Sequence, residues 1–80
     1  MNAYILHSER LGKFYVGIAT SPEKRLKQHN SGHSRWSRRA DDWRIVYRKA
    51  FDSVAQAREH EQKIKARGAA RFLQDLARHG

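Results

Sequence analysis

The chain has 80 residues and a formal net charge of +9 at pH 7. A chain this short buries only about 60% of its unfolded surface, so we expect one small domain spanning residues 1–80. Lys and Arg outnumber Asp and Glu by 17 to 8, which is more than solubility requires and favours a polyanionic partner. The absence of Cys excludes a disulfide framework, a zinc ribbon and a thiol nucleophile, and is typical of a cytoplasmic protein.

The apolar residues indicate a folded, water-soluble domain. They make up 39% of the chain, which is enough for a core and argues against disorder despite the charge. They occur in short runs, so the sequence predicts neither a membrane-spanning helix nor the apolar core of a signal peptide.

The N-terminal part of the chain predicts a β-hairpin followed by a short helix. Residues 3–8 and 13–19 are rich in β-branched and aromatic side chains, and residues 9–12 between them form a turn that ends in Gly. The segment Thr-Ser-Pro-Glu then offers an N-cap hydroxyl, a Pro at the first helical position and an early acid. We therefore expect a helix over residues 22–29, with Asn-Ser-Gly as its stop.

The second half predicts one more strand and two more helices. Residues 32–42 are polar and lack a clear period, so we expect a loop there. Residues 43–51 indicate a third strand, with Trp43, Ile45 and Tyr47 on one face. A capping box at residue 53 opens a helix that Gly68 ends, and a final helix follows. The ββαβαα order predicts an α+β domain with one small three-stranded antiparallel sheet.

Glu61 is a charged residue on the predicted packing face of the longer helix. Its helical stripe also contains Val54, Ala57 and Ile64. A carboxylate on such a face needs a cation, a metal ion or a hydrogen-bond donor, because desolvating it alone is costly. The spacing leaves open both an ion pair with Arg25 or another Arg and a functional site.

Two further positions stand out on the hairpin and the short helix. Arg25 and His29 lie one helical turn apart and flank Leu26, an arrangement that suits an anion such as phosphate unless both are simply solvated. On the second strand Tyr15 and Gly17 point the same way, so a notch should lie beside the phenol. Gly17 could equally mark a bulge or a close helix contact.

Short motifs follow one another along nearly the whole chain. They are Tyr-Ile-Leu at 4–6, Tyr-Val-Gly at 15–17, a helix with Arg, His and Asn-Ser-Gly at 23–32, and a helix with Glu ahead of Ile-Lys at 57–65. In this order and spacing the motifs resemble the GIY-YIG nuclease superfamily, particularly its small stand-alone bacterial members, which are similar to the SLX1-type nuclease domain. Each motif alone is short, but the ordered set is specific.

The resemblance implies a site where a single divalent metal, Mg²⁺ or Mn²⁺, assists hydrolysis of DNA phosphodiester bonds. Glu61 would hold the metal, and Arg25 would stabilise the charge that develops on the phosphate. Tyr15 would act as general base or position water, and Tyr4 would support it by a hydrogen bond. His29 is a second candidate base or a phosphate ligand, and the sequence does not decide between Tyr15 and His29.

The resemblance also bears on target choice. In the excision-repair nuclease of this superfamily a Lys follows the second signature, whereas here that position is Ile18. The short chain is expected to carry no targeting domain, so we expect an endonuclease directed by DNA structure or backbone, on branched or single-stranded DNA in repair or recombination, or aided by a protein partner. The alternative is a non-catalytic nucleic-acid-binding module on the same scaffold.

A basic segment supplies a candidate grip on the nucleic-acid backbone. Its cations surround a Trp that could stack on an unpaired base, although a solvated loop with the Trp folded onto the domain is an equal alternative. The candidate nucleic-acid-binding residues are Arg35, Trp36, Arg38, Arg39 and Arg44.

Overall fold

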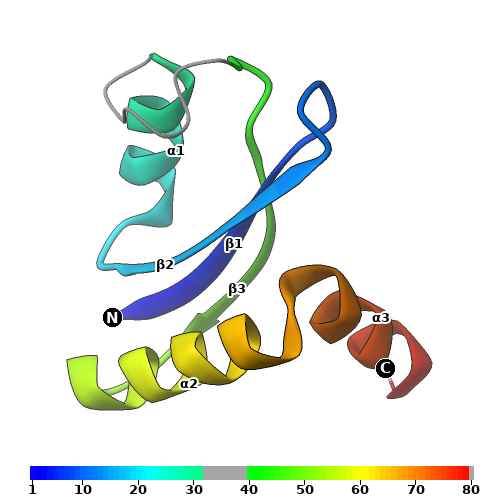
Figure 1. The fold of residues 1–80 in the computed structure, drawn as a ribbon. Helices are drawn as coiled ribbons and strands as arrows, with labels where there is room; N and C mark the ends of the chain where they lie inside the picture. The colour runs from blue at the N-terminus through cyan, green and yellow to red at the C-terminus, as the bar shows by residue number, and fades with distance from the viewer. Residues whose placement is uncertain (32–39, 80) are drawn as a thin grey trace.

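The computed structural model describes residues 1–31 and 40–79, whose elements follow the predicted ββαβαα order. They are β1 (Asn2–Ser8), β2 (Lys13–Ala19), α1 (Pro22–Asn30), β3 (Arg44–Ala50), α2 (Val54–Arg67) and α3 (Ala69–His79). The strands form one antiparallel three-stranded sheet, which confirms the predicted α+β class. Figure 1 shows α1 on one side of this sheet and α2 with α3 on the other.

The central strand of the sheet is β1, with β2 and β3 on either side of it. Residues 3–6 are fully buried, because helices cover both faces of this strand and each face must then be apolar. The hairpin turn between β1 and β2 closes as predicted, with Gly12 at a φ of 62° and its N–H donating to the Ser8 carbonyl over 2.8 Å. The register places Tyr4 directly opposite Gly17 on the edge strand β2.

A register shift interrupts the pairing of β1 with β3. Ile5 lies opposite Tyr47, whereas Leu6 lies opposite Ile45, so β3 contains one extra residue between these pairs. The prediction that Trp43, Ile45 and Tyr47 share one face is therefore wrong. Ile45 packs on the core cluster that contains Trp43 and Leu6, but Tyr47 contacts side chains of α2 and α3.

Helix α1 forms where its capping residues predict it. The Ser21 hydroxyl accepts a hydrogen bond from the Lys24 N–H over 3.4 Å, and Pro22 occupies the first turn. Leu26 packs against the core cluster on the α1 side of the sheet, which consists of Tyr4, Leu6, Ala19, Ala40 and Trp43. Besides Leu26, the helix buries Pro22 at its start and His29 near its end, while Glu23, Lys24, Arg25, Lys27 and Gln28 are exposed.

Helices α2 and α3 cover the opposite face. The predicted cap at Ser53 is present, since its hydroxyl accepts from the Gln56 N–H over 3.2 Å. The buried stripe of α2 is Ala57, Glu61 and Ile64, whereas Val54, which the spacing places on the same stripe, is 47% exposed.

The junction between α2 and α3 is a sharp turn. Gly68 ends α2 with a φ of 92°, and the Arg67 guanidinium then binds both carboxylate oxygens of Asp75 on α3, at 2.8 and 3.0 Å. The ring of Phe72 meets Tyr47 edge-on at 5.0 Å between centroids, while Leu76 stays 42% exposed. The apolar side chains of α3 are thus only partly covered.

Among residues 1–31 and 40–79, no helix combines the length and apolar character that a membrane crossing needs.

Candidate active site

The predicted site residues gather where the edge strand β2 passes between α1 and α2. Tyr4 and Tyr15 come from the paired strands β1 and β2, with ring centroids 6.2 Å apart. Arg25 on α1 and Glu61 on α2 approach from opposite faces of the sheet, close enough that both charges act on the titration of the Tyr4 hydroxyl. The fold therefore brings these four side chains, which are far apart in the sequence, into one neighbourhood.

The notch that the sequence predicts beside Tyr15 is present, and the Tyr4 side chain occupies it. A Cβ atom built on Gly17 would stand 2.9 Å from the Tyr4 hydroxyl oxygen and 3.1 Å from Cε1 of Tyr15. Such contacts are closer than van der Waals packing permits. Gly17 is therefore the residue that lets the two phenols converge at this edge of the sheet.

The Tyr4 phenol keeps its proton over the physiological range. Burial is the main cause that raises the pKa of Tyr4 to about 12; nearby Tyr15 and Glu61 raise it further, while the Arg25 cation opposes them. A phenol in this state can donate a hydrogen bond but cannot serve as a base near neutral pH.

His29 lies beneath Tyr15 at the C-terminal end of α1. It is only 4% exposed, and its ring centroid is 4.4 Å from that of Tyr15 and 6.0 Å from that of Trp43. Burial first, and then the Arg25 cation, lower the pKa of His29, so its imidazole is neutral at pH 7. Because it is buried, the His29 imidazole contacts the Tyr15 ring and is largely shielded from bulk water.

Asn30 is a residue of this region whose role the sequence did not reveal beyond its place in the helix stop. Its side-chain amide donates to the Trp43 carbonyl over 3.0 Å and accepts from the Trp43 N–H over 2.8 Å. This pair of bonds fastens the chain that enters β3 to the end of α1. It thereby holds Trp43 against His29.

Glu61 has a partner that neither sequence alternative named. It is 8% exposed, and its Oε2 lies 3.4 Å from Nζ of Lys65, four residues along the same helix, so the cation beside it is a Lys and not the Arg of the ion-pair alternative. The sequence spacing could have predicted Lys65 as this partner, because residues four apart on a helix are neighbours. The Lys65 side chain is half exposed and can leave the pair without unfolding the helix.

The Glu61 region fits a hard divalent cation only as a site completed by water and substrate. In the described residues no group of three or more His, Asp or Glu side chains is placed to hold a metal ion. Mg²⁺ typically keeps several waters and takes one or two carboxylates together with substrate phosphates, a demand that one carboxylate at a solvent-reachable edge can meet.

Arg25 borders a cavity of about 340 Å³ at the start of α1. The cavity also contacts Ile18, Thr20, Lys24 and Gln28, but not Tyr4, Tyr15 or Glu61. The predicted residues thus lie close together, yet only Arg25 connects them to this cavity.

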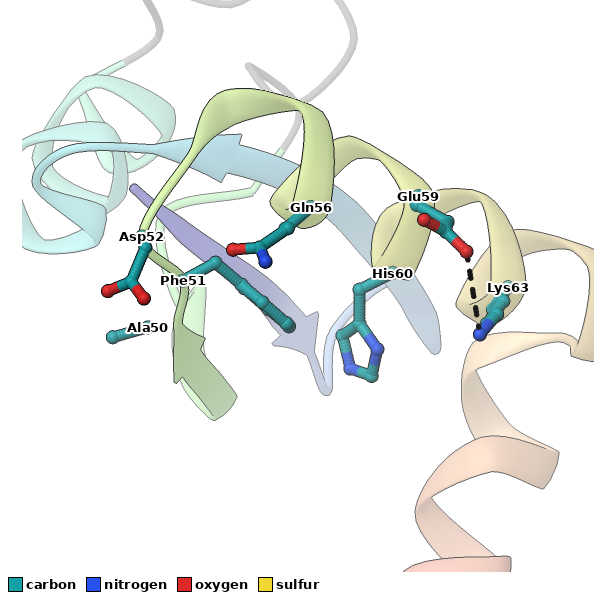
Figure 2. A pocket seen from close by; sticks show the side chains of 7 residues that line it. All are labelled: Ala50, Phe51, Asp52, Gln56, Glu59, His60 and Lys63. Carbon is teal, nitrogen blue, oxygen red and sulfur yellow. Dashed lines mark ion pairs between the residues drawn. The ribbon is translucent and has the colours of Figure 1, made fainter.

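A second cavity, of about 320 Å³, lies between α2 and the end of β3 (Figure 2). Figure 2 shows the His60 ring and the ion-paired Glu59 and Lys63 around it. The Tyr47 hydroxyl lies 2.9 Å from Nε2 of His60 at its edge. None of the predicted site residues in the described part of the chain borders this cavity.

The candidate nucleic-acid-binding segment lies almost entirely outside the described residues, since these lack Arg35, Trp36, Arg38 and Arg39. Arg44, at the start of β3, is exposed, and its guanidinium lies 3.9 Å from the Glu9 carboxylate. Exposed pairs of this kind contribute little to stability and release their cation readily.

Comparison with known protein families identifies the family of this chain. The family model of the GIY-YIG catalytic domain matches residues 1–73. No significant match was found among curated proteins or among solved structures. Because the family match covers nearly the whole chain, this protein belongs to the GIY-YIG family, a nuclease-type family whose substrate is nucleic acid.

Proposed function

We propose that this protein is a metal-dependent endonuclease that hydrolyses DNA phosphodiester bonds and selects its target by backbone and shape rather than by base sequence. The observation that carries the proposal is that Arg25 and Glu61, from helices on opposite sides of the sheet, are both near enough to Tyr4 for their charges to act on its hydroxyl, while the Tyr15 ring lies 6.2 Å from that of Tyr4. A cation, a carboxylate and two phenols in one neighbourhood suit the chemistry of a phosphodiester.

Each residue of the site would have its own role around the scissile phosphate. Arg25 is exposed and makes no ion pair within the described residues, so its guanidinium is available to stabilise charge on the phosphate oxygens. Tyr15 would position or deprotonate the attacking water, and the neutral imidazole of His29, whose ring centroid lies 4.4 Å from that of Tyr15, would assist that proton transfer. Tyr4, which retains its proton, supports Tyr15 as a hydrogen-bond donor.

Glu61 is the residue that would hold Mg²⁺ or Mn²⁺. When bound, the metal would neutralise developing charge on a phosphate oxygen. The Glu61 carboxylate would change partner for this purpose, from the half-exposed Lys65 to the ion.

The charge of the molecule favours recognition of the backbone over recognition of bases. A net charge of +9 on 80 residues supplies long-range attraction to any nucleic acid, and phosphate contacts carry no sequence information. Target choice would then depend on branched or single-stranded structure, or on a protein partner.

A cleavage panel tests the proposal. Branched, nicked and single-stranded DNA, with RNA alongside, are incubated with Mg²⁺ or Mn²⁺ and with the wild-type protein, Glu61→Gln or Arg25→Ala. Exposed residues of the same types on α2 provide matched controls, Glu59→Gln for the carboxylate and Arg58→Ala for the guanidinium. We expect at least a hundredfold loss of rate from each site variant, as for other groups that stabilise transition-state charge, and no change from the controls.

The outcomes separate the candidate functions. Equal cleavage by all variants would indicate a contaminating nuclease and would overturn the assignment of the site. An absence of cleavage on every substrate, together with tight salt-dependent binding that Glu61→Gln leaves unchanged, would replace the nuclease with a non-catalytic binding module.

A further inference from the structure

The cavity beside Arg25 has a lining suited to an anion. It lies where β2 ends and α1 begins, and Lys24, Arg25 and Gln28 border it from the helix. Lys24 and Gln28 are one helical turn apart, so their side chains share a face of α1. The lining contains no acidic residue.

The cations of this cavity are not neutralised by neighbouring carboxylates. In the described residues neither Lys24 nor Arg25 forms an ion pair, and the acid that precedes them, Glu23, binds Arg48 on β3. That interaction, chiefly its hydrogen bond, lowers the pKa of Glu23, and the other oxygen of the same carboxylate accepts a hydrogen bond from the Ser21 hydroxyl over 3.4 Å.

Hydrogen bonds hold the rim of the cavity in place. The Asn2 side-chain amide donates to the carbonyls of Ala19 and Thr20, at 3.3 and 3.2 Å, which fastens the turn between β2 and α1 to the first residue of β1. Ser21 then caps the helix. A ligand would therefore meet a largely preformed cavity and pay less ordering entropy on binding.

The position of the cavity relative to the tyrosines decides which part of a substrate it can take. Arg25 belongs both to the surroundings of Tyr4 and to the cavity lining, whereas Tyr4, Tyr15 and Glu61 do not line the cavity. A phosphate at the tyrosine pair would thus be held from one side by Arg25, and the strand on that side would continue into the cavity.

We propose that this cavity is the subsite for the sugar–phosphate unit next to the scissile phosphate, with Lys24 as the phosphate contact and Gln28 as a hydrogen-bonding partner. This inference rests on the proposed function. The volume of about 340 Å³ lies near the small end of ligand pockets and suits one nucleotide unit rather than a duplex. Ile18 provides an apolar wall for the sugar, and Lys24 supplies the compact point charge that phosphate accepts.

Binding of a fluorescent single-stranded oligonucleotide, measured by anisotropy in EDTA over a range of salt concentrations, tests the subsite without requiring cleavage. Lys24→Ala should weaken binding about tenfold and reduce the slope of log affinity against log salt by about one. Gln28→Ala should weaken binding less and leave the slope unchanged. Lys27→Ala is the matched control, because Lys27 is an exposed lysine of the same helix outside the cavity lining.

Equal losses from Lys24→Ala and Lys27→Ala would overturn the subsite, since they would report only the total charge of α1. Far-ultraviolet circular dichroism and the midpoint of thermal unfolding establish that each variant is folded. Failure of this inference is distinct from failure of the proposed function. If the protein cleaves DNA but Lys24→Ala and Lys27→Ala lose equal oligonucleotide affinity, only the subsite is refuted. If affinity falls in Lys24→Ala alone and no substrate is cleaved, the nuclease function is refuted and the binding site stands.

Discussion

Gly17 is the residue on which the packing of the site depends most directly. It faces Tyr4 across the β1–β2 pairing, and any side chain at this position would meet the Tyr4 hydroxyl oxygen at 2.9 Å and the Tyr15 ring at 3.1 Å. The φ of Gly17 is not positive, so the requirement for glycine is one of space and not of backbone conformation. The glycine of the Tyr-Val-Gly motif is thus the residue that allows Tyr4 and Tyr15 to pack together.

Gly17→Ala should destabilise the fold by about 1–3 kcal/mol, the usual cost of forcing an extra methyl group into a packed site. Chemical unfolding of the purified variant measures this loss. Removing the hydroxyl with Tyr4→Phe should relieve part of the clash, so the double variant is expected to be more stable than the sum of the two single changes predicts. Strictly additive effects would contradict a direct contact between the two positions.

Glu61 shows how far single residues could be assigned from the sequence. Helical spacing correctly predicted that this carboxylate lies on the buried stripe with Ala57 and Ile64. The sequence left its partner open between an Arg and a functional site, whereas the structure places Lys65, one turn away, beside it. Its proximity to Tyr4, in contrast, depends on how α2 packs across the sheet, which local spacing does not encode.

At the scale of elements, the Asn30 side chain links the end of α1 to the residue before β3. The Asn30 amide forms both a donor and an acceptor bond with the backbone of Trp43. Such a pair satisfies two backbone groups that the sheet leaves unpaired just before β3 begins. It therefore positions Trp43, and through it the buried His29, relative to the rest of the site.

Asn30→Ala should cost about 1–3 kcal/mol, because it removes the partner of two partly buried backbone groups. Amide hydrogen exchange followed by NMR gives the sharper test: the Trp43 N–H should lose protection in Asn30→Ala but keep much of it in Asn30→Asp, which retains an acceptor. Ser31→Ala is the control, since the Ser31 hydroxyl only donates to the Gln28 carbonyl on an exposed surface. Unchanged protection of the Trp43 N–H in Asn30→Ala would show that the Asn30 amide does not hold the Trp43 backbone.

The positions of the helices and strands follow from nearby residues in the sequence, but the side of the sheet that a given side chain faces does not always do so. Ser21 and Ser53 cap the helices that the sequence places after them, because capping depends on residues within one turn. The division of Ile45 and Tyr47 between two sides of the sheet depends on a register shift against β1. A bulge of this kind is set by pairing with a strand about forty residues away, so the period of β3 alone could not predict it.

For the molecule as a whole, the site depends on both helical layers being in place. Arg25 comes from α1 on one side of the sheet and Glu61 from α2 on the other. A domain of 80 residues has little buried surface to spare, so loss of either layer should dismantle the site and the fold together. Conditions that act on buried groups should therefore affect activity and stability in parallel.

Acid should destabilise this protein from about pH 6.5 downwards. Burial and then Arg25 lower the pKa of His29, and burial, Lys49 and Lys63 lower that of His60. In the unfolded chain both imidazoles return to a pKa of about 6.5, so below that pH the unfolded state binds protons that the folded state does not. The free energy of unfolding then falls with pH, by at most about 1.4 kcal/mol per pH unit for each proton, until the folded-state pKa values are passed.

Urea unfolding at a series of pH values between about 7 and about 5 measures this slope. His29→Gln should flatten it, because one of the groups that charge only on unfolding is removed. Glu23→Gln should not flatten the slope, since Arg48 lowers the pKa of Glu23 and the stability from that pair is lost only as pH falls below the ordinary glutamate pKa of 4.5. A wild-type stability that stays constant across the window, or a slope that His29→Gln leaves unchanged, would show that the buried imidazole does not couple protonation to folding.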